Sequence, residues 1–377
     1  MWTKGLAALF PSSFYHPGQY TLLPLRAEDS DDALYPPSLY TRLRTWSATS
    51  RKVPDTFQWD PNVFKFEQPK PAYLDAPVSV PLVIRLAIIS RPDGFEKRQA
   101  LRESMLKGVP STHVQLDYKF FVARADSWTT KLKIAKEKIY YGDIEVLGSI
   151  RDVPGRISEK RFAALKWTAN SVHYDYSMTM DSDSFCRLRA LSQRLRHVYA
   201  EIKSQTVPVL FGSMSSQHVY YINTVPDDNP NENEEDSHVI GPWYSYPAGI
   251  GYLMSSNLST TMANLDPPLP HHIKYPSDDV MIGAWAAGLR YLPDATQQFE
   301  SSPDNSEEPV HRVYPKPYLP YIVPASTIDD KVGWHDFKHR GGAQRPIGWE
   351  SICVHRVHPD EMRALREREE FRGEWDN

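Results

Sequence analysis

The sequence predicts an α/β fold in which a largely parallel sheet is flanked by helices. From about residue 78 onward, short apolar runs that suit buried strands alternate with amphipathic segments that suit helices. The composition agrees, because 41% hydrophobic and 24% charged residues are typical of a globular protein with a sizeable core. A chain of 377 residues is long enough for one large domain or two ordinary ones.

Residues 1–78 are predicted to form an extended lead-in or stem. This part contains proline-rich and acidic stretches such as EDSDDALYPPS and shows no sustained helical or strand periodicity. Its apolar run KGLAALF is short for a signal segment, and no run approaches the roughly 20 apolar residues that cross a bilayer. We therefore expect membrane association only if an N-terminal anchor precedes this sequence.

Residues 79–377 are expected to form the main domain, which begins with a strand, a helix and a second strand. VPLVIRLAIIS (80–90) is a short apolar run that ends at a polar serine, as a buried strand does. FEKRQALRESMLKG (95–108) has the spacing of an amphipathic helix that Gly108 terminates. DYKFFVARAD (117–126) is the second predicted strand.

The alternation of helices and strands continues to residue 180. Residues 129–148 are predicted to form a helix followed by a third strand, and residues 157–173 another amphipathic helix. The run from Tyr174 to Met180 alternates polar and apolar residues, as a half-buried strand does. Ligands collect beyond the carboxyl ends of strands in such sheets, so the residues after Met180 are a candidate binding site.

The predicted elements are more widely spaced in the last part of the chain. DDNPNENEEDSH (227–238) is expected to be an acidic surface loop. YSYPAGIGYLMS (244–255) predicts an aromatic strand, and YPSDDVMIGAWAAGL (275–289) predicts a helix that starts with two acids. SICVHRVHPDEMRALREREEF (351–371) predicts a strand, a turn and a charged helix. One disulfide between the two cysteines, Cys186 and Cys353, is possible.

Asp181-Ser182-Asp183 is the candidate metal site, because it stands at the carboxyl end of a predicted strand. The same tripeptide at residues 29–31 lies in a polar stretch without periodicity. The two copies therefore differ in their position relative to a predicted strand, and only the second one is a candidate site. Carboxylate oxygens suit magnesium or manganese, which usually also bind phosphate oxygens. The tripeptide alone leaves a structural role open, since an acidic chain contains such patterns by chance.

Other polar residues allow both a structural and a functional interpretation. Asp278 and Asp279 suit a helix N-terminus, or a general base that takes a proton from a hydroxyl group. Arg98 and Arg102 lie four residues apart on one helix and suit either a solvated face or a diphosphate site. Lys160 likewise suits either a structural or a functional role.

A histidine could complete a metal site with the two aspartates. His355 lies in the apolar strand ICVHRV and is either a buried core histidine or a metal ligand. Spacing alone leaves His335, His339 and His358 as competitors. The aromatic segment 243–252 likewise suits either a core or a sugar-binding surface, whose glycines would let a ligand approach the backbone.

In their order along the chain, these motifs resemble the β-1,3-glycosyltransferases of glycosyltransferase family 31, the galactosyltransferase and Fringe-like group. The family's Arg-x-x-Ile-Arg-x-Thr-Trp, Asp-Asp-Asp-x-Phe and Glu-Asp-Val-x-x-Gly motifs are similar to residues 98–105, 181–185 and 278–283. The other similar stretches are 120–122, 137–144, 152–160, 244–252 and His355. Ser182 and Met105 depart from the family's Asp and Trp, and Pro154 and Arg156 from its Tyr and Asn.

The resemblance implies a GT-A fold, a nucleotide-sugar-binding α/β fold with a mixed central sheet, over residues 79–377. It implies a divalent cation, usually manganese, a UDP-sugar donor and a glycan or glycolipid acceptor. The implied metal ligands are Asp181, Asp183 and His355, and the implied donor-side residues are Arg98, Arg102, Lys160, Asp181 and Asp183. Asp279 would be the catalytic base, and the acceptor side would include Trp243, Tyr246, Gly249, Gly251 and Asp278.

The implied reaction is an inverting displacement that moves a hexose or N-acetylhexosamine, with galactose favoured, into a β-1,3 linkage. A metal ion would stabilise the charge that develops on the departing UDP. Family members are typically anchored in the Golgi, so the resemblance implies a Golgi membrane or lumenal location. The glycosylation sequon Asn257-Leu258-Ser259 agrees with that route. The net charge of −4 argues against a nucleic-acid partner.

Two alternatives remain from the sequence. One is a haloacid-dehalogenase-like phosphoryl-transfer enzyme with Asp181 as nucleophile and Asp183 as acid. In that class the Asp-x-Asp usually closes the first strand, whereas about three predicted strands precede it here. The other alternative is a non-catalytic carbohydrate-binding descendant.

Overall fold

The structure is a computed structural model of the whole chain. The residues that it describes in full are 63–153, 156–171, 173–215, 245–264, 279, 282, 283, 286, 325–336 and 346–376. The backbone alone is described for strand residues 20–21, 216–223, 238–244, 290–293 and 313–316. The predicted acidic loop at 227–238 lies outside the described residues, apart from the backbone of His238.

The chain divides into two compact units. The larger contains residues 51–215, 247–266 and 325–377, and the smaller contains residues 1–50, 216–246 and 267–324. In the described part of the predicted lead-in, Val63 and Leu74 are buried in the hydrophobic core of the larger unit. Residues 63–78 are therefore part of the packed fold and not an extended stem.

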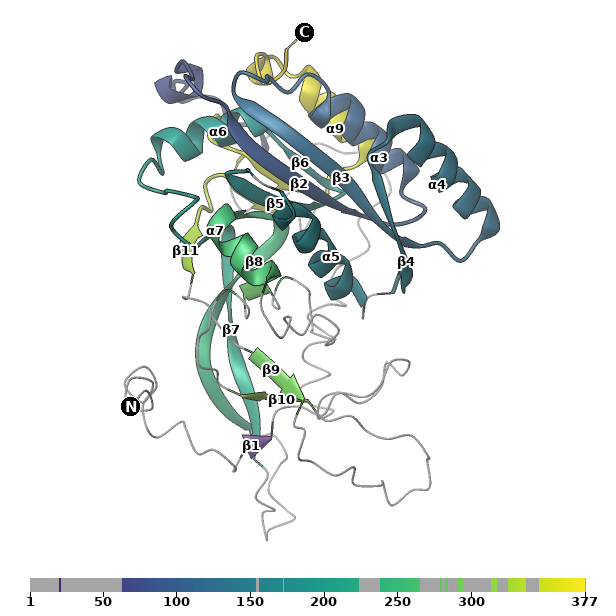
Figure 1. Cartoon of the computed structure of the whole chain (residues 1–377). Helices are drawn as coiled ribbons and strands as arrows, with labels where there is room; N and C mark the ends of the chain where they lie inside the picture. The colour runs from purple at the N-terminus through teal and green to yellow at the C-terminus, as the bar shows by residue number, and fades with distance from the viewer. Residues whose placement is uncertain are drawn as a thin grey trace. The chain divides into compact units, whose positions relative to one another are not determined.

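A mixed β-sheet with the strand order β1-β7-β8-β5-β2-β3-β4 is the main structural feature (Figure 1). The bounds are β1 Tyr20–Thr21, β2 Leu82–Ser90, β3 Val114–Arg124, β4 Ile144–Arg151, β5 Tyr176–Asp181, β7 Val209–Asn223 and β8 His238–Ser255. Strands β4, β3, β2 and β5 pair in parallel, whereas β8 pairs antiparallel with β5. An eighth strand, β11 (Ser326–Asp329), pairs in parallel with β7. The predicted α/β class with a mixed central sheet is confirmed.

Helices cover both faces of the parallel strands (Figure 1). Their bounds are α3 Phe95–Leu101, the π-helical continuation η4 Arg102–Leu106, α4 Trp128–Tyr141, α5 Ile157–Ala169, α6 Leu188–His197, α7 Ser256–Ala263 and α9 Pro359–Glu367. Ile84, Leu86 and Ile88 of β2 belong to the core that includes residues of α3, α6 and α9. The intervening Ala87 and Ile89 pack with α5, because successive strand residues point to opposite faces.

Glycine ends two of these helical segments, at Gly108 as predicted and at Gly142. Gly108 has a φ of +76°, and a Cβ there would lie 2.5 Å from the carbonyl oxygen of Asp376. Gly142, with a φ of +72°, caps α4 in the left-handed conformation. These backbone conformations strain residues that have a Cβ. Gly108 therefore fixes where the helical segment that starts with α3 ends, and Gly142 fixes where the chain leaves α4 for β4.

A second, three-stranded sheet consists of β6 (Ser184–Cys186), β13 (Cys353–His355) and β12 (Trp334–Asp336). Strands β6 and β13 are antiparallel, with Cys353 opposite Cys186 and His355 opposite Ser184. The two cysteines form a disulfide that spans 167 residues of sequence. The disulfide therefore links the strand after Asp183 to the strand that carries His355.

The smaller unit contains a β-hairpin-like pair, β9 (Arg290–Pro293) and β10 (Val313–Lys316), which run antiparallel. No helix in the described part of the chain combines the length and apolarity that a membrane crossing requires.

Candidate functional site

The Asp-Ser-Asp tripeptide forms the turn between β5 and β6. Asp181 is the last residue of β5, and Ser184 is the first of β6. The backbone N–H of Ser182 donates to the carbonyl of Ile89 at 2.9 Å, and the Ser184 hydroxyl donates to a carbonyl of β8 at 2.7 Å. The turn is therefore fixed to both strands that flank β5, at the carboxyl end of the parallel strands.

The two aspartates of this turn and His355 lie together. His355 Nε2 is 3.4 Å from Asp183 Oδ1, and the backbone N–H of Val357 donates to the Asp183 carbonyl at 2.9 Å. Asp181, Asp183 and His355 each offer a ligand atom, and these atoms all lie within 4.8 Å of one another. Within the described ranges, the structure thus brings together the three side chains that the sequence proposes as metal ligands.

The competing histidines are engaged elsewhere or lie outside the described residues. His335 Nε2 is 2.7 Å from the Ser351 hydroxyl. His358 is the N-cap of α9, where its backbone N–H donates to the Glu361 carboxylate at 2.6 Å. His339 lies outside the described residues. The register of β13 on β6 is what selects His355.

The donor set of this cluster fits a divalent metal ion. One imidazole nitrogen with carboxylate oxygens suits manganese and similar cations. The other ring nitrogen, Nδ1, is buried and lies 3.5 Å from Asp336 Oδ1. A carboxylate on the far ring nitrogen is the common arrangement for metal-binding histidines, because it orients the ring. Asp336 also accepts a hydrogen bond from Arg356 Nε at 2.9 Å.

Neighbouring side chains offset part of the charge of the cluster. Lys97 Nζ lies 3.1 Å from Asp183 Oδ2, and Arg161 Nη2 lies 2.7 Å from Asp181 Oδ1. Burial alone would lower the pKa of His355, but hydrogen bonds with Asp183 and Asp336 raise that pKa to about 10. Burial alone would raise the pKa of Asp183, but His355 and Lys97 hold it well below its usual range.

Lys97, Arg161 and Asp336 are members of this site that the sequence-based prediction missed. Lys97 directly precedes Arg98 in α3, and Arg161 directly follows Lys160 in α5. Adjacent residues on a helix point in different directions, so only one of each pair can face the site. The sequence motifs alone do not say which one it is. Nothing local in the sequence Trp-His-Asp marks Asp336, whose place follows from the pairing of β12 with β13.

Lys160 lies close to the end of β2, the strand beside β5. Its Nζ donates to the carbonyl of Ser90 at 3.2 Å and to Asp152 Oδ1 at 2.7 Å. Lys160 is buried, whereas the Asp152 side chain is 22% exposed. The predicted donor role of Lys160 stays a prediction, but its position beyond the carboxyl end of β2 is compatible with that role.

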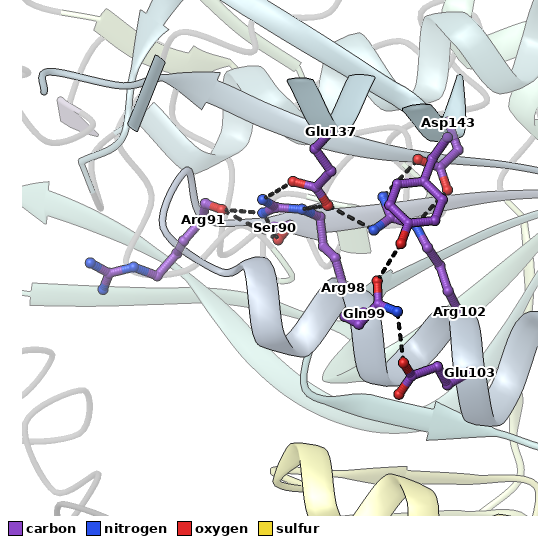
Figure 2. Close-up of polar contacts among 9 residues, drawn as sticks. Ser90, Arg91, Arg98, Gln99, Arg102, Glu103, Glu137 and Asp143 are labelled. Atoms are coloured by element: carbon purple, nitrogen blue, oxygen red, sulfur yellow. Dashed lines mark hydrogen bonds and ion pairs between the residues drawn. The ribbon is translucent and has the colours of Figure 1, made fainter. Parts of the chain in front are cut away.

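Arg98 and Arg102 form an ion-pair network with Glu137 and Asp143, which we call the arginine–carboxylate network. Figure 2 shows both guanidinium groups facing carboxylates that come from α4 and from Asp143, the residue directly before β4. Arg98 Nη2 lies 2.6 Å from Glu137 Oε2, and Arg102 Nη1 lies 2.7 Å from Glu137 Oε1. Arg102 also binds Asp143 through two nitrogens, at 2.8 and 2.7 Å. The network therefore joins two of the family-like motifs, residues 98–105 and 137–144.

Arg98 also holds the end of β2. Its side chain is 0% exposed, and Nη1 donates to the Ser90 hydroxyl at 3.1 Å and to the carbonyl of Arg91 at 2.7 Å (Figure 2). Burial would raise the pKa of Glu137, but its hydrogen bonds with the two arginines lower it. The structure thus gives both arginines partners within the protein, and their predicted contact with a donor diphosphate stays a prediction.

Strand β8 carries part of the predicted acceptor side. Gly251 has a φ of +128°, and a Cβ there would lie 3.1 Å from Met180 Cβ. A glycine is required here because β8 passes close to β5 just before Asp181. Gly249 is half-buried on the same strand. Only the backbone of Trp243 is described, and Asp278 lies outside the described residues.

Asp279 and Tyr246 belong to the smaller unit. Residues 279, 282, 283 and 286 are helical, and Ile282 and Ala286 are buried. A Cβ on Gly283 would lie 2.3 Å from Tyr246 Cβ and 2.4 Å from the Ser245 carbonyl oxygen. The helical segment that contains the predicted base therefore packs on the predicted acceptor strand at Gly283, which makes that contact possible.

Comparisons with known proteins agree with this arrangement of motifs. The galactosyltransferase family profile matches residues 96–293, just over half of the chain. A hydroxyproline O-galactosyltransferase of Arabidopsis thaliana, GALT5, is 26% identical over 215 residues, which are 54% of this chain and 29% of that protein. The β-1,3-galactosyltransferase GALT1 of the same plant is 23% identical over 213 residues, 55% of this chain and 31% of that protein.

The chain spans less than a third of the length of these curated relatives. Among solved structures, galactosyltransferase LgtC in complex with donor and acceptor sugar analogues is 10% identical, with a TM-score of 0.34 over 77% of this chain and 99% of that one. The match of the family profile over more than half of the sequence is decisive, and this chain belongs to the galactosyltransferase family, as the order of its motifs predicts.

Proposed function

We propose that this chain is a metal-dependent inverting glycosyltransferase with a GT-A-type fold. It transfers a hexose or N-acetylhexosamine from a UDP-sugar to a hydroxyl group of a glycan or glycolipid, and galactose is the favoured sugar. The observation that carries the proposal is the convergence of Asp181, Asp183 and His355 at the carboxyl end of β5 in a member of the galactosyltransferase family. The name of the relative GALT1 supports a β-1,3 linkage.

Asp181, Asp183 and His355 would hold the divalent cation, and Asp336 would orient the His355 ring. When bound, the ion supplies positive charge that stabilises the diphosphate leaving group. Lys97 adds a cation at the same place, because its Nζ lies 3.1 Å from Asp183 and its side chain is 40% exposed. A half-exposed lysine can turn toward phosphate oxygens, and Lys97 therefore joins Arg98, Arg102 and Lys160 as a proposed donor-side residue.

Asp279 is the proposed general base. It takes the proton from the acceptor hydroxyl while that oxygen bonds to the anomeric carbon and the bond to UDP breaks. Attack from the face opposite UDP inverts the anomeric configuration. The proposed acceptor side consists of Trp243, Tyr246, Gly249, Gly251 and Asp278.

The family assignment contradicts the haloacid-dehalogenase-like alternative, because the galactosyltransferase profile spans the Asp-Ser-Asp turn itself. We propose a Golgi membrane or lumenal location for the protein. The disulfide between Cys186 and Cys353 supports this proposal, since disulfides persist in the oxidising secretory route. No nucleic-acid partner is proposed, because the net charge is −4.

The test is release of UDP by the purified chain from a panel of UDP-sugars, with manganese and then with excess EDTA. We expect turnover with manganese, fastest for UDP-galactose, that EDTA abolishes and added manganese restores. Turnover that EDTA leaves unchanged would contradict the metal dependence. Manganese-dependent UDP binding without any turnover, in the presence of diverse acceptors, would favour the non-catalytic carbohydrate-binding descendant.

A further inference from the structure

Helix α4 has an unusual amount of exposed apolar surface. Five of the nine large apolar side chains that are exposed in the described part of the chain lie on it, namely Trp128, Leu132, Ile139, Tyr140 and Tyr141. Trp128 is 70% exposed, Tyr140 80% and Ile139 86%. Scattered exposed apolar residues are ordinary, but their concentration on one 14-residue helix marks an interaction surface.

Three of these side chains, Trp128, Leu132 and Ile139, form a stripe on the outer side of the helix. Tyr141 instead faces the protein, where its hydroxyl donates to Gln99 and its ring lies 3.8 Å from the guanidinium carbon of Arg102. Trp128, Leu132, Ala135 and Ile139 follow one another at intervals of four, three and four residues, which places them on one face. Glu137, which binds the arginine–carboxylate network, points to the opposite side at 3.6 residues per turn. The stripe therefore points away from the protein and extends over roughly 16 Å of helix.

Lysines border the stripe. Lys131 and Lys138 fall on one flank of the helix and Lys136 on the other, and all three are exposed, as is Lys133. Glu137 is the one acid within α4, and both of its carboxylate oxygens bind arginines. Lys133 lies toward the protein, with its Nζ 5.8 Å from the centre of the Phe95 ring. The outward face of α4 thus combines apolar side chains with three bordering lysines, and the helix contributes no acid to this face.

We propose that α4 docks on the surface of an anionic lipid bilayer. An apolar stripe between lysines fits a planar interface, where the stripe enters the acyl boundary and the ammonium groups reach the headgroups. Trp128 and Tyr140 stand near the two ends of the helix and are residue types that suit a membrane–water interface. A second copy of the same face is a poor occupant, because it would set lysines against lysines.

This inference is independent of the proposed catalysis, and its test uses the full chain without substrate. Sedimentation is measured with vesicles of phosphatidylcholine alone and with equimolar phosphatidylcholine and phosphatidylserine. The apolar variant is Trp128→Ser with Ile139→Ser, and the charge variant is Lys131→Gln with Lys138→Gln. The matched control is Val198→Ser with Val332→Ser, two exposed apolar residues outside α4 that are 40% and 42% exposed.

We expect the wild type and the control to bind the anionic vesicles in preference to the neutral ones, and added salt to weaken this binding. Each α4 variant should bind about tenfold more weakly or worse. All variants should unfold at the wild-type temperature, because the replaced side chains are exposed. Equal binding by the α4 variants and the control would overturn the proposal, as would failure of the wild type to bind anionic vesicles. Self-association without vesicles that the apolar variant loses would overturn it in favour of a second copy.

Discussion

Replacing Asp279 with asparagine is expected to reduce sugar transfer by about 10²–10⁴-fold, because the amide cannot accept the proton of the acceptor hydroxyl. Asparagine has nearly the same size, so the packing of the helical segment on Tyr246 through Gly283 should persist. Manganese-dependent UDP affinity should also persist, since the proposed base acts on the acceptor and not on the donor. Transfer is measured as product formed at saturating acceptor, and UDP affinity by calorimetry.

The matched control is Asp360→Asn, which removes the charge of an acid that is 84% exposed at the start of α9. This variant should transfer sugar at the wild-type rate. If the Asp279→Asn variant also transferred sugar normally, the base would have to be another residue. Loss of UDP affinity in parallel with loss of transfer would instead assign Asp279 to donor binding.

Replacing Arg98 with methionine is expected to lower the free energy of unfolding by about 3–5 kcal/mol, the range for removing one partner of a buried ion pair. Methionine retains much of the side-chain length but none of the five donors. The change leaves the buried Glu137 carboxylate with Arg102 alone and frees the carbonyl of Arg91 at the end of β2. Urea unfolding of the purified chain measures the effect.

Two further variants show whether the effect comes from the buried charge. Arg363→Met removes a surface network with Glu96 and Glu103, whose side chains are 67% and 45% exposed, and should cost about 1 kcal/mol or less. Arg98→Met combined with Glu137→Leu should recover part of the lost stability, because the carboxylate that has lost one of its two arginines is removed while Arg102 keeps its pair with Asp143. A loss in Arg98→Met no larger than that in Arg363→Met would show that the network contributes little to the fold.

Local sequence patterns were sufficient to predict the central strands and helices. The apolar run at 80–90 and the alternation at 174–180 correspond to β2 and β5. The half-buried character predicted for residues 174–180 is wrong, because the polar Ser177 and Thr179 are buried along with their apolar neighbours. The end of the helical segment at Gly108 was predicted, and glycine suits it because the backbone there is left-handed. The buried positions of Val63 and Leu74 escaped prediction, since an irregular segment that packs on a core has no periodicity.

The composition of the site depends on contacts between residues that are far apart in sequence, and local sequence patterns could not predict these contacts. Glu137 meets Arg98 across 39 residues, so the helix-face argument could not distinguish a diphosphate site from a buried ion pair. His355 could be separated from the other histidines only by the register that sets it opposite Ser184 in the second sheet. Asp336 is brought to the same ring by the parallel pairing of β12 and β13.

The central claim is that one cation binds between the Asp-Ser-Asp turn and the imidazole of residue 355, and pulsed electron paramagnetic resonance of manganese bound to the full chain tests it most directly. We expect a coupling to an imidazole nitrogen in the wild type and in His335→Gln, and its loss in His355→Gln; adding UDP should introduce a coupling to phosphorus. A manganese signal without nitrogen coupling, or one that His355→Gln leaves unchanged, would contradict the claim.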